Sequence, residues 1–263
     1  DQSVGVYFAE VPQARTQGLN SGFFDIASVQ ILKGPQGTLF GRNTTGGALL
    51  ITPAAPTDEF GGYVKGTYGA YNLADFEAAV NAPISDRIQL RLAGKVTRRD
   101  GTVWSTTDKA HIGNVNNHSW RASLRLLLSD SITNTTVVTG HRDLSDGTVM
   151  KINAMKPTGT FVTLRDGLSQ LDELKAYPFH TTTAPNLPNG TDIKTLTVSN
   201  ITEFDVGFAK LKNIFGYRKV DAKVDWLNTG DRYQTYRITP IDNGKQISEE
   251  LNLSGEAMGG NLD

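Results

Sequence analysis

The stretch that decides the fold runs from Asp25 to Thr52 and reads DIASVQILKGPQGTLFGRNTTGGALLIT. An apolar segment stands at each end, and the turn between them is rich in glycine: Gly34, Gly37, Gly41, Gly46 and Gly47. Glycine permits positive φ and close approach of one backbone to another. The pattern therefore predicts two short strands joined by a sharp turn, in which the glycines are structural and contact no ligand.

The glycine-rich turn has two competing interpretations. A phosphate-binding loop would need a G-K-[ST] step and a following amphipathic helix, and the sequence has neither. A plain loop with no further role is the other interpretation. The segment Val4 to Phe8 adds an apolar run before the turn, so residues up to about Pro56 read as a small domain with much irregular backbone.

Composition excludes several function classes. The 263 residues carry 26 basic and 27 acidic side chains, which leaves no electrostatic footprint for nucleic acid. There is no cysteine, so disulfides and thiolate metal sites are excluded. The four histidines (His111, His118, His141 and His180) match no metal or catalytic spacing. We therefore expect no enzyme activity, no metal site and no cofactor.

The remainder of the chain, after a linker at Pro53 to Pro56, is dominated by period-two alternation. From Arg87 to Arg98, aliphatic side chains fall on one face and arginine, glutamine and lysine on the other. His118 to Leu128 repeats this pattern. No run reaches the roughly 18 apolar residues of a transmembrane helix, whereas transmembrane strands need no such run.

Eight strands are predicted in this part: 60–68, 71–84, 87–98, 118–128, 131–144, 191–206, 208–226 and 247–254. Several exceed the usual strand length of about 5–6 residues in soluble proteins. Short turns at Gly69-Ala70, Ser85-Asp86, Ser129-Asp130 and Gly207 contrast with long polar connections at 100–117, 145–190 and 228–245. Short turns at one end and long loops at the other are typical of outer-membrane barrels. The pattern leaves the register of Ser131 to Leu144 undecided.

The signature resembles that of TonB-dependent outer-membrane receptors. The resemblance rests on Lys33-Gly34-Pro35, Gly37, Leu39-Phe40-Gly41 and Gly46-Gly47 between two apolar strands, and on the preceding segment from Ser3 to Phe8. It implies a mainly β fold, with residues 1–56 as the C-terminal part of a plug domain. Residues 57–263 would then be the N-terminal part of an antiparallel transmembrane β-barrel, about 8 of roughly 22 strands. The chain would be an internal piece without the TonB-binding segment.

The resemblance also implies a function and a location. A receptor of this family lies in the cell outer membrane, contacts its lipid, and takes up a scarce nutrient with energy from the TonB complex. A ferric siderophore is the expected substrate, with cobalamin, haem or an oligosaccharide as alternatives. A passive porin and a soluble β-rich binding module are the alternatives outside the family.

One polar contact between plug and barrel is predicted. The segment Ile247 to Leu253 resembles a recurrent barrel strand of the family whose glutamate faces the plug, and parity turns Glu250 inward. Lys33 and Arg42 are the candidate partners of Glu250 on the plug. Tyr177 to His180 could stack on an aromatic chelate or a sugar, or could tuck its own loop down, and no ligand-binding residue is assigned.

Overall fold

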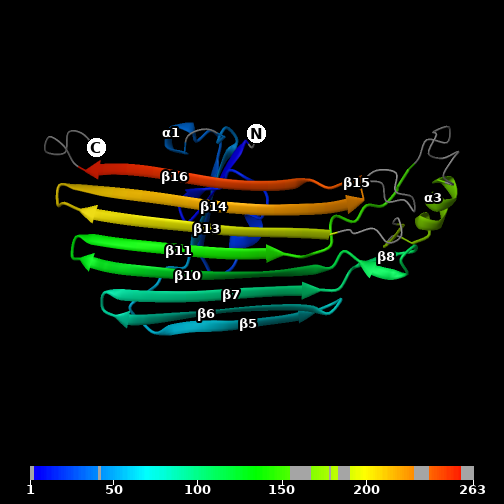
Figure 1. Ribbon diagram of the computed structural model, residues 1–263, viewed down its shortest axis with the longest axis horizontal. Helices are drawn as coiled ribbons and strands as arrows, with labels where there is room; N and C mark the ends of the chain where they lie inside the picture. Colours follow the sequence, from blue (N-terminus) through cyan, green and yellow to red (C-terminus); the bar gives the residue numbers. More distant parts are fainter. Residues whose placement is uncertain are drawn as a thin grey trace.

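The computed structural model describes residues 3–40, 43–154, 167–177, 179–182, 190–227 and 237–255. A small N-terminal sheet lies against one face of a much larger sheet (Figure 1). The N-terminal sheet has the order β2-β1-β4-β3, formed by β1 (Val4–Phe8), β2 (Val11–Pro12), β3 (Ile26–Lys33) and β4 (Gly47–Pro53). The apolar run from Val4 to Phe8 is β1, and the two strands predicted on either side of the glycine-rich turn are β3 and β4.

Helices are short. They are the 3-10 turn η1 (Leu19–Gly22), α1 (Gly37–Phe40) within the glycine-rich turn, and α3 (Gly167–Lys175). Within the part of the chain that the structure describes, no helix is long and apolar enough to cross a membrane. Two signature glycines meet a clear backbone need, since Gly34 has φ +82° and Gly47 has φ +146°. At Gly47 a side chain would also collide with the Leu32 carbonyl.

The large sheet is antiparallel throughout, with the order β15-β14-β13-β11-β10-β7-β6-β5 and with β16 also paired to β14. Its strands are β5 (Gly61–Gly69), β6 (Leu73–Ser85), β7 (Ile88–Arg99), β10 (Val115–Ser129), β11 (Ile132–Asp143), β13 (Gly190–Asp205), β14 (Ala209–Leu227), β15 (Arg237–Ile238) and β16 (Ile241–Gly255). Eight of these correspond to the predicted strands. The mainly β fold class is confirmed.

Strand ends differ from the prediction where polar residues interrupt the alternation. β16 begins at Ile241, six residues before the predicted start at Ile247. Asp242 and Gly244 break the apolar pattern there, yet their backbone pairs with Ala222 and Val220 of the long strand β14. Backbone pairing therefore continues beyond the stretch that the apolar pattern marks.

One short turn was assigned to the wrong end of the sheet. The turn after Gly69 lies at the end where the long connections are, because Asn72 Nδ2 donates to Asp100 Oδ2 at 2.6 Å and the Asp100 N–H donates to the Tyr71 carbonyl at 2.8 Å. Asp100 opens the long connection after β7. The first hairpin is therefore tight at an end where the following connections are long.

The two faces of the large sheet have different surroundings. Gln89, Asn81 and Arg121 point toward the N-terminal sheet and are almost fully buried, whereas Leu92 and Val96 point away and are more than 40% exposed. This confirms the predicted parity. In β11, Val137, Thr139 and His141 are buried on the inner face, which settles the register that the sequence left open.

The outer face of β11 and β13 carries a closed group of four polar side chains, the Asn/Thr tetrad: Asn134, Thr136, Asn200 and Thr202. Its two amides and two hydroxyls hold six hydrogens, and all six are donated within the tetrad. The bonds measure 2.7–3.5 Å. Rows of apolar residues flank the tetrad along the strands, Ile132 paired with Phe204 on one side and Val138 with Val198 on the other.

A third, small sheet lies where only polar loops were predicted. It has the order β12-β8-β9, from β8 (Val103–Ser105), β9 (Ala110–Ile112) and β12 (His180–Thr181). Figure 1 places β8 and α3 together beyond one end of the large sheet. Strands of two or three residues are too short to produce an alternation signal.

Candidate functional site

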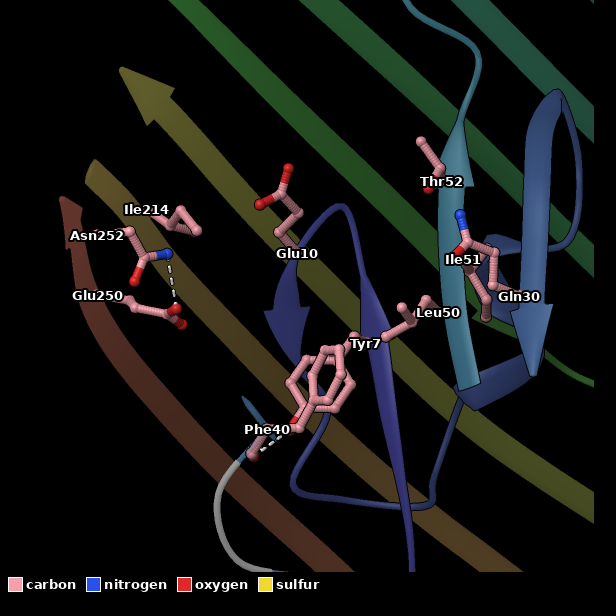
Figure 2. A pocket seen from close by; sticks show the side chains of 10 residues that line it. All are labelled: Tyr7, Glu10, Gln30, Phe40, Leu50, Ile51, Thr52, Ile214, Glu250 and Asn252. Atoms are coloured by element: carbon pink, nitrogen blue, oxygen red, sulfur yellow. Dashed lines mark hydrogen bonds between the residues drawn. The ribbon is translucent and has the colours of Figure 1, made fainter. Parts of the chain in front are cut away.

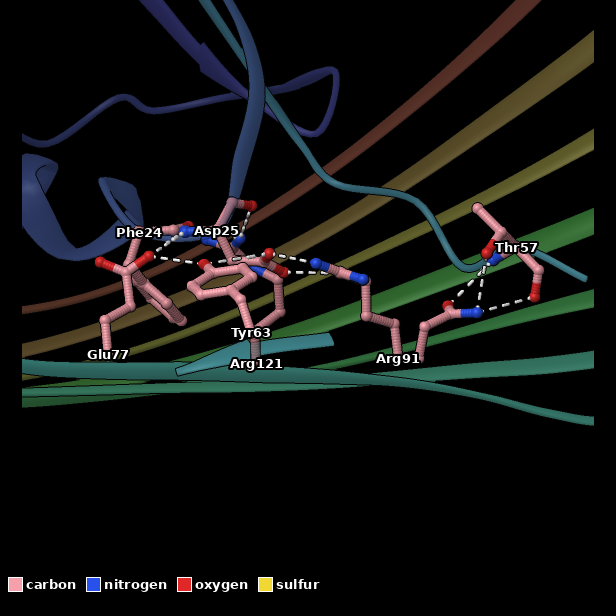
Figure 3. A network of polar contacts seen from close by, with 8 residues as sticks. Phe24, Asp25, Thr57, Tyr63, Glu77, Arg91 and Arg121 are labelled. Carbon is pink, nitrogen blue, oxygen red and sulfur yellow. Dashed lines mark hydrogen bonds and ion pairs between the residues drawn. The ribbon is translucent and has the colours of Figure 1, made fainter. Parts of the chain in front are cut away.

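Asp25, directly before β3, is held by several side chains of the large sheet (Figure 3). Its N–H donates to Glu77 Oε1 at 3.0 Å, and its carbonyl accepts from Arg121 Nη1 at 3.0 Å. Its carboxylate accepts from Arg91 Nε at 2.9 Å, from Arg91 Nη2, and from the Tyr63 hydroxyl at 3.3 Å. The four partners stand on β5, β6, β7 and β10.

The backbone at Asp25 is in the left-handed region, with φ +48°. Such a conformation is uncommon outside glycine, although aspartate tolerates it better than most residues. The side chain is 2% exposed, so its charge is compensated by Arg91 and not by water. Four strands of the large sheet therefore fix an uncommon conformation immediately before β3.

Arg121 holds the backbone of the same segment. Its guanidinium donates to the carbonyls of Gly22 at 3.0 Å, Phe24 at 2.9 Å and Asp25 at 3.0 Å, and to Thr139 Oγ1 at 3.2 Å. The guanidinium carbon also lies 4.3 Å from the ring centre of Phe24. Arg121 is 2% exposed, and a charge so buried needs this full set of partners.

A second group of side chains on the large sheet also binds main-chain carbonyls. Arg218 Nη2 donates to the Gln17 carbonyl at 2.7 Å, and Ser199 Oγ donates to the Ala9 carbonyl at 2.7 Å. Gln246 Nε2 donates to the Pro12 carbonyl at 2.7 Å. Most of these contacts involve backbone atoms of the N-terminal segment, whatever its side chains are.

Two ion pairs at the same interface are more open to solvent. Lys212 Nζ lies 2.7 Å from Glu10 Oε1, and Arg15 Nη1 lies 2.9 Å from Asp242 Oδ1. Partly hydrated pairs of this kind contribute about 1 kcal/mol or less each. The interface thus combines deeply buried arginines with weaker charge pairs at its margin.

Comparison with known proteins identifies receptors with similar sequences. No family model matches the chain. The chain is 33% identical over 95 residues to the pesticin receptor of Yersinia pestis, which covers 36% of the chain and 14% of that receptor. It is 25% identical over 158 residues to the ferrioxamine B receptor of Salmonella typhimurium, which covers 56% of the chain and 22% of that receptor.

Solved structures agree over nearly the whole chain. The ferric yersiniabactin uptake receptor FyuA of Yersinia pestis matches with a TM-score of 0.74 at 17% identity, over 97% of this chain and 37% of that one. The ferric-catecholate import receptor Fiu of E. coli matches with a TM-score of 0.73 at 15% identity, over 99% and 40%. The chain has the plug-and-barrel fold of the TonB-dependent outer-membrane receptors. It spans less than half the length of each of these relatives.

With this assignment, the N-terminal sheet corresponds to the plug and the large sheet to the barrel. The expected domain boundary at residue 56 falls between β4, which ends at Pro53, and β5, which begins at Gly61. Asn81 holds this linker, because its amide donates to the Thr57 carbonyl at 3.0 Å and accepts from the Thr57 N–H at 3.0 Å. The boundary itself stays a prediction.

Glu250 points inward, as parity requires. It lines a cavity of about 470 Å³ between plug and barrel together with Tyr7, Phe40 and Ile214 (Figure 2). Tyr7 donates its hydroxyl hydrogen to the Phe40 carbonyl at 2.7 Å. Burial, and secondarily the negative charge of Glu250, raises the pKa of Tyr7 above its ordinary value.

Of the two predicted partners of Glu250, the structure describes Lys33 and not Arg42. Lys33 ends β3, and within the described ranges no hydrogen bond or ion pair joins it to Glu250, which accepts instead from Asn252 Nδ2 at 2.9 Å. Arg42 and Gly41 lie outside the described residues. Of the other signature residues, Gly34, Pro35, Gly37 and Gly46 lie in the turn between β3 and β4, and Gly47 begins β4. A contact of Glu250 with the signature stays a prediction.

Sequence reasoning missed the main anchors, Asp25, Arg91 and Arg121. A signal for them exists. Arg91 and Arg121 are inward residues of predicted strands, and their pairing partners on the neighbouring strand are small, Ser123 and Ala93. Small neighbours leave room for a long side chain to reach the plug. An inward arginine among small residues is therefore a useful marker of a plug contact.

Proposed function

We propose that the full-length protein imports a ferric siderophore across the outer membrane, with energy from the TonB complex of the inner membrane. The names of the similar proteins support this substrate class, since they include a ferrioxamine B receptor, a ferric yersiniabactin uptake receptor and a ferric-catecholate import receptor. These names describe transport receptors. We infer accordingly that this protein carries out no catalysis.

The observation that carries the proposal is the polar character of the plug–barrel interface. Apolar clusters there are small, one around Phe8 and Ile51 with Val137 of the barrel, the other formed by Phe24 with Ala79 and Ala93. Many of the specific contacts are hydrogen bonds that Arg121 and Arg218 donate or that the carboxylate of Asp25 accepts. Water can replace such bonds, whereas a large dry interface would resist separation.

A transport cycle follows from this arrangement. The plug fills the inner face of the barrel, so a substrate bound from outside cannot pass while Asp25 and the 22–25 backbone stay in place. Force transmitted from TonB to the plug would break the contacts of Arg91 and Arg121 with Asp25. Because Arg91 and Arg121 are fixed on the paired strands β7 and β10, they remain in position to re-bind the plug when the force ends.

Uptake of labelled iron tests the proposal. Cells that express the full-length receptor, and matched deletion cells, are given a ferric siderophore labelled with radioactive iron under iron limitation. We expect receptor-dependent accumulation that is lost when tonB is deleted or the proton-motive force is collapsed. Receptor-dependent entry that persists without TonB would indicate a passive porin. Receptor-dependent uptake of cobalamin, haem or an oligosaccharide, with no uptake of ferric siderophore, would replace the substrate class.

A further inference from the structure

The small sheet beyond the barrel carries a row of aromatic rings. Cross-strand pairing places His180 beside Trp104, and Trp104 beside His111, so the three side chains share one face. The rings of Trp104 and His111 lie 5.2 Å apart in an edge-to-face arrangement. Tyr177 stacks on His180 with ring centres 4.6 Å apart and an interplanar angle of 14°. The row joins two different long connections of the barrel.

The row is fixed by backbone contacts. The Trp104 N–H donates to the Phe179 carbonyl at 2.9 Å, and the Thr106 N–H donates to the Thr181 carbonyl at 2.9 Å. Lys151 Nζ donates to the Tyr177 carbonyl at 2.8 Å. These bonds set the position of each ring before any ligand arrives, which lowers the entropy that binding must remove.

The opposite face of the small sheet is closed. Ser105 and Thr181, the next residues along β8 and β12, are fully buried. By contrast, His111 and Tyr177 are exposed, and Trp104 and His180 are half-buried. Ring faces in water attract planar partners, because stacking removes apolar surface on both sides. The accessible face of the sheet is therefore the one that carries the row.

A cavity of about 400 Å³ adjoins the row at His111 and is lined by Tyr71, Asn72, Asp100 and Asn114. Its volume lies within the range of roughly 300–1,000 Å³ that is typical of small-molecule sites. The row itself contains no lysine, arginine or carboxylate. Its donors are the indole and imidazole N–H groups, which suit neutral or phenolate oxygens.

We propose that Trp104, His111, His180 and Tyr177 form a binding site for the aromatic rings of a ferric siderophore that carries catecholate or phenolate groups. The rings stack on the row, and the remaining polar part of the chelate occupies the cavity beside His111. The proposal rests on the proposed function and narrows its substrate class. A chelate built only from hydroxamates has no aromatic ring, so the row does not increase its affinity.

Binding to the purified full-length receptor tests the site. Calorimetry with a ferric tris-catecholate siderophore, and separately with the ferric trihydroxamate ferrioxamine B, gives the two dissociation constants. Trp104→Ala and His111→Ala are compared with Trp120→Ala and His118→Ala, whose side chains lie on the outer face of β10. We expect Trp104→Ala to weaken catecholate binding about tenfold, the effect of losing one or two ring contacts.

The outcomes separate the two proposals. Weaker catecholate binding in both row variants, with the β10 variants unchanged and a Trp104→Phe variant close to the parent, supports the site. Unchanged catecholate binding in Trp104→Ala overturns it. Tight binding of ferrioxamine B with no catecholate binding also overturns it and leaves siderophore uptake standing. Failure of both ferric chelates to bind would reject the proposed function as well.

Discussion

Two polar networks lie on opposite faces of the same barrel sheet, and they are built differently. The inner network around Asp25 includes ionised groups and continues through Glu77 to Lys95, which is 26% exposed. The outer network is the Asn/Thr tetrad, which contains no ionised group and donates all its hydrogens internally. The inner network binds the plug, whereas the tetrad donates hydrogen bonds only among its own four side chains.

The difference follows from what each face meets. The inner face meets the plug and water, so charges can be compensated there and can exchange partners. The outer face meets lipid, where an unpaired polar group costs several kcal/mol and no water can take its place. Polar side chains on the lipid face are tolerated when they satisfy one another. Single substitutions in the two networks should therefore change the free energy of unfolding in different ways.

The largest effect is expected for Arg121→Met. This change removes a donor from three plug carbonyls. The Gly22 and Asp25 carbonyls keep the N–H groups of Phe24 and Ala54, whereas the Phe24 carbonyl keeps no donor among the described residues. Losing one partner of a buried charged network costs about 3–5 kcal/mol. Hydrogen exchange of plug amides in residues 22–26 of the full-length receptor should accelerate by roughly 100-fold or more. Arg125→Met is the control, because Arg125 lies on the same strand and face and, within the described residues, makes no hydrogen bond to the plug. Equal exchange in the two variants would contradict the anchor.

A double-mutant cycle of Asp25→Asn with Arg91→Met should give the next largest value. We expect a coupling of about 1.5–3 kcal/mol, as for hydrogen bonds between charged groups. Asparagine tolerates the same backbone conformation as aspartate, so the change isolates the charge. The matched cycle of Lys95→Met with Asp75→Asn, a half-exposed pair on the same sheet, should give less than about 1 kcal/mol. Urea unfolding measures both, and similar values would remove the distinction.

In the tetrad, one substitution should lower the stability of the barrel more than replacement of all four residues. Asn134→Leu alone removes the acceptor of one Asn200 amide hydrogen and of the Thr136 hydroxyl, and should destabilise the barrel by about 1–3 kcal/mol. Replacing the whole tetrad, with Leu at 134 and 200 and Val at 136 and 202, should restore stability to near the parent value, because apolar side chains suit lipid. Unfolding in lipid vesicles measures both variants. A fourfold variant much less stable than Asn134→Leu would show that the tetrad does more than satisfy itself.

The smallest effect concerns Tyr7. Glu250→Gln removes a negative charge that opposes phenolate formation, so the pKa of Tyr7 should fall. It should stay above the ordinary value near 10, because burial is the larger cause. Glu10→Gln, at the rim of the same cavity, is the control and should leave the pKa where it is. Carbon-13 NMR of the labelled ring, assigned with Tyr7→Phe, reports the titration.

The sequence predicts those parts of the fold that repeat along one strand. The two faces of the strand from Ile88 to Arg98 can be predicted from that segment alone, because the alternation of apolar and polar residues is local. The β11 register could not be read because Asn134 and Thr136 stand among apolar residues on the outer face, and their partner Asn200 lies 66 residues from Asn134. The small sheet escaped prediction for a related reason, because His180 and Trp104 meet only when two connections pair.

In the candidate site, too, local features could be predicted from the sequence and contacts between distant residues could not. The inward direction of Glu250 followed from parity, but the four partners of Asp25 come from four separate strands and converge only in three dimensions. No spacing in the sequence predicts that these residues meet. The glycine-rich signature located the plug, whereas the residues that hold it were distributed over the barrel.

Arg121, Arg218, Ser199 and Gln246 contact carbonyl oxygens of the plug, and every amino acid carries one. A mutation at Gln17 can thus alter the side chain without removing the carbonyl that Arg218 contacts. Evolution can diversify this part of the plug while docking persists, and chimaeras that exchange these segments between distant homologues should assemble. Asp25, Phe24 and Arg15 differ, because there the barrel also contacts the side chain.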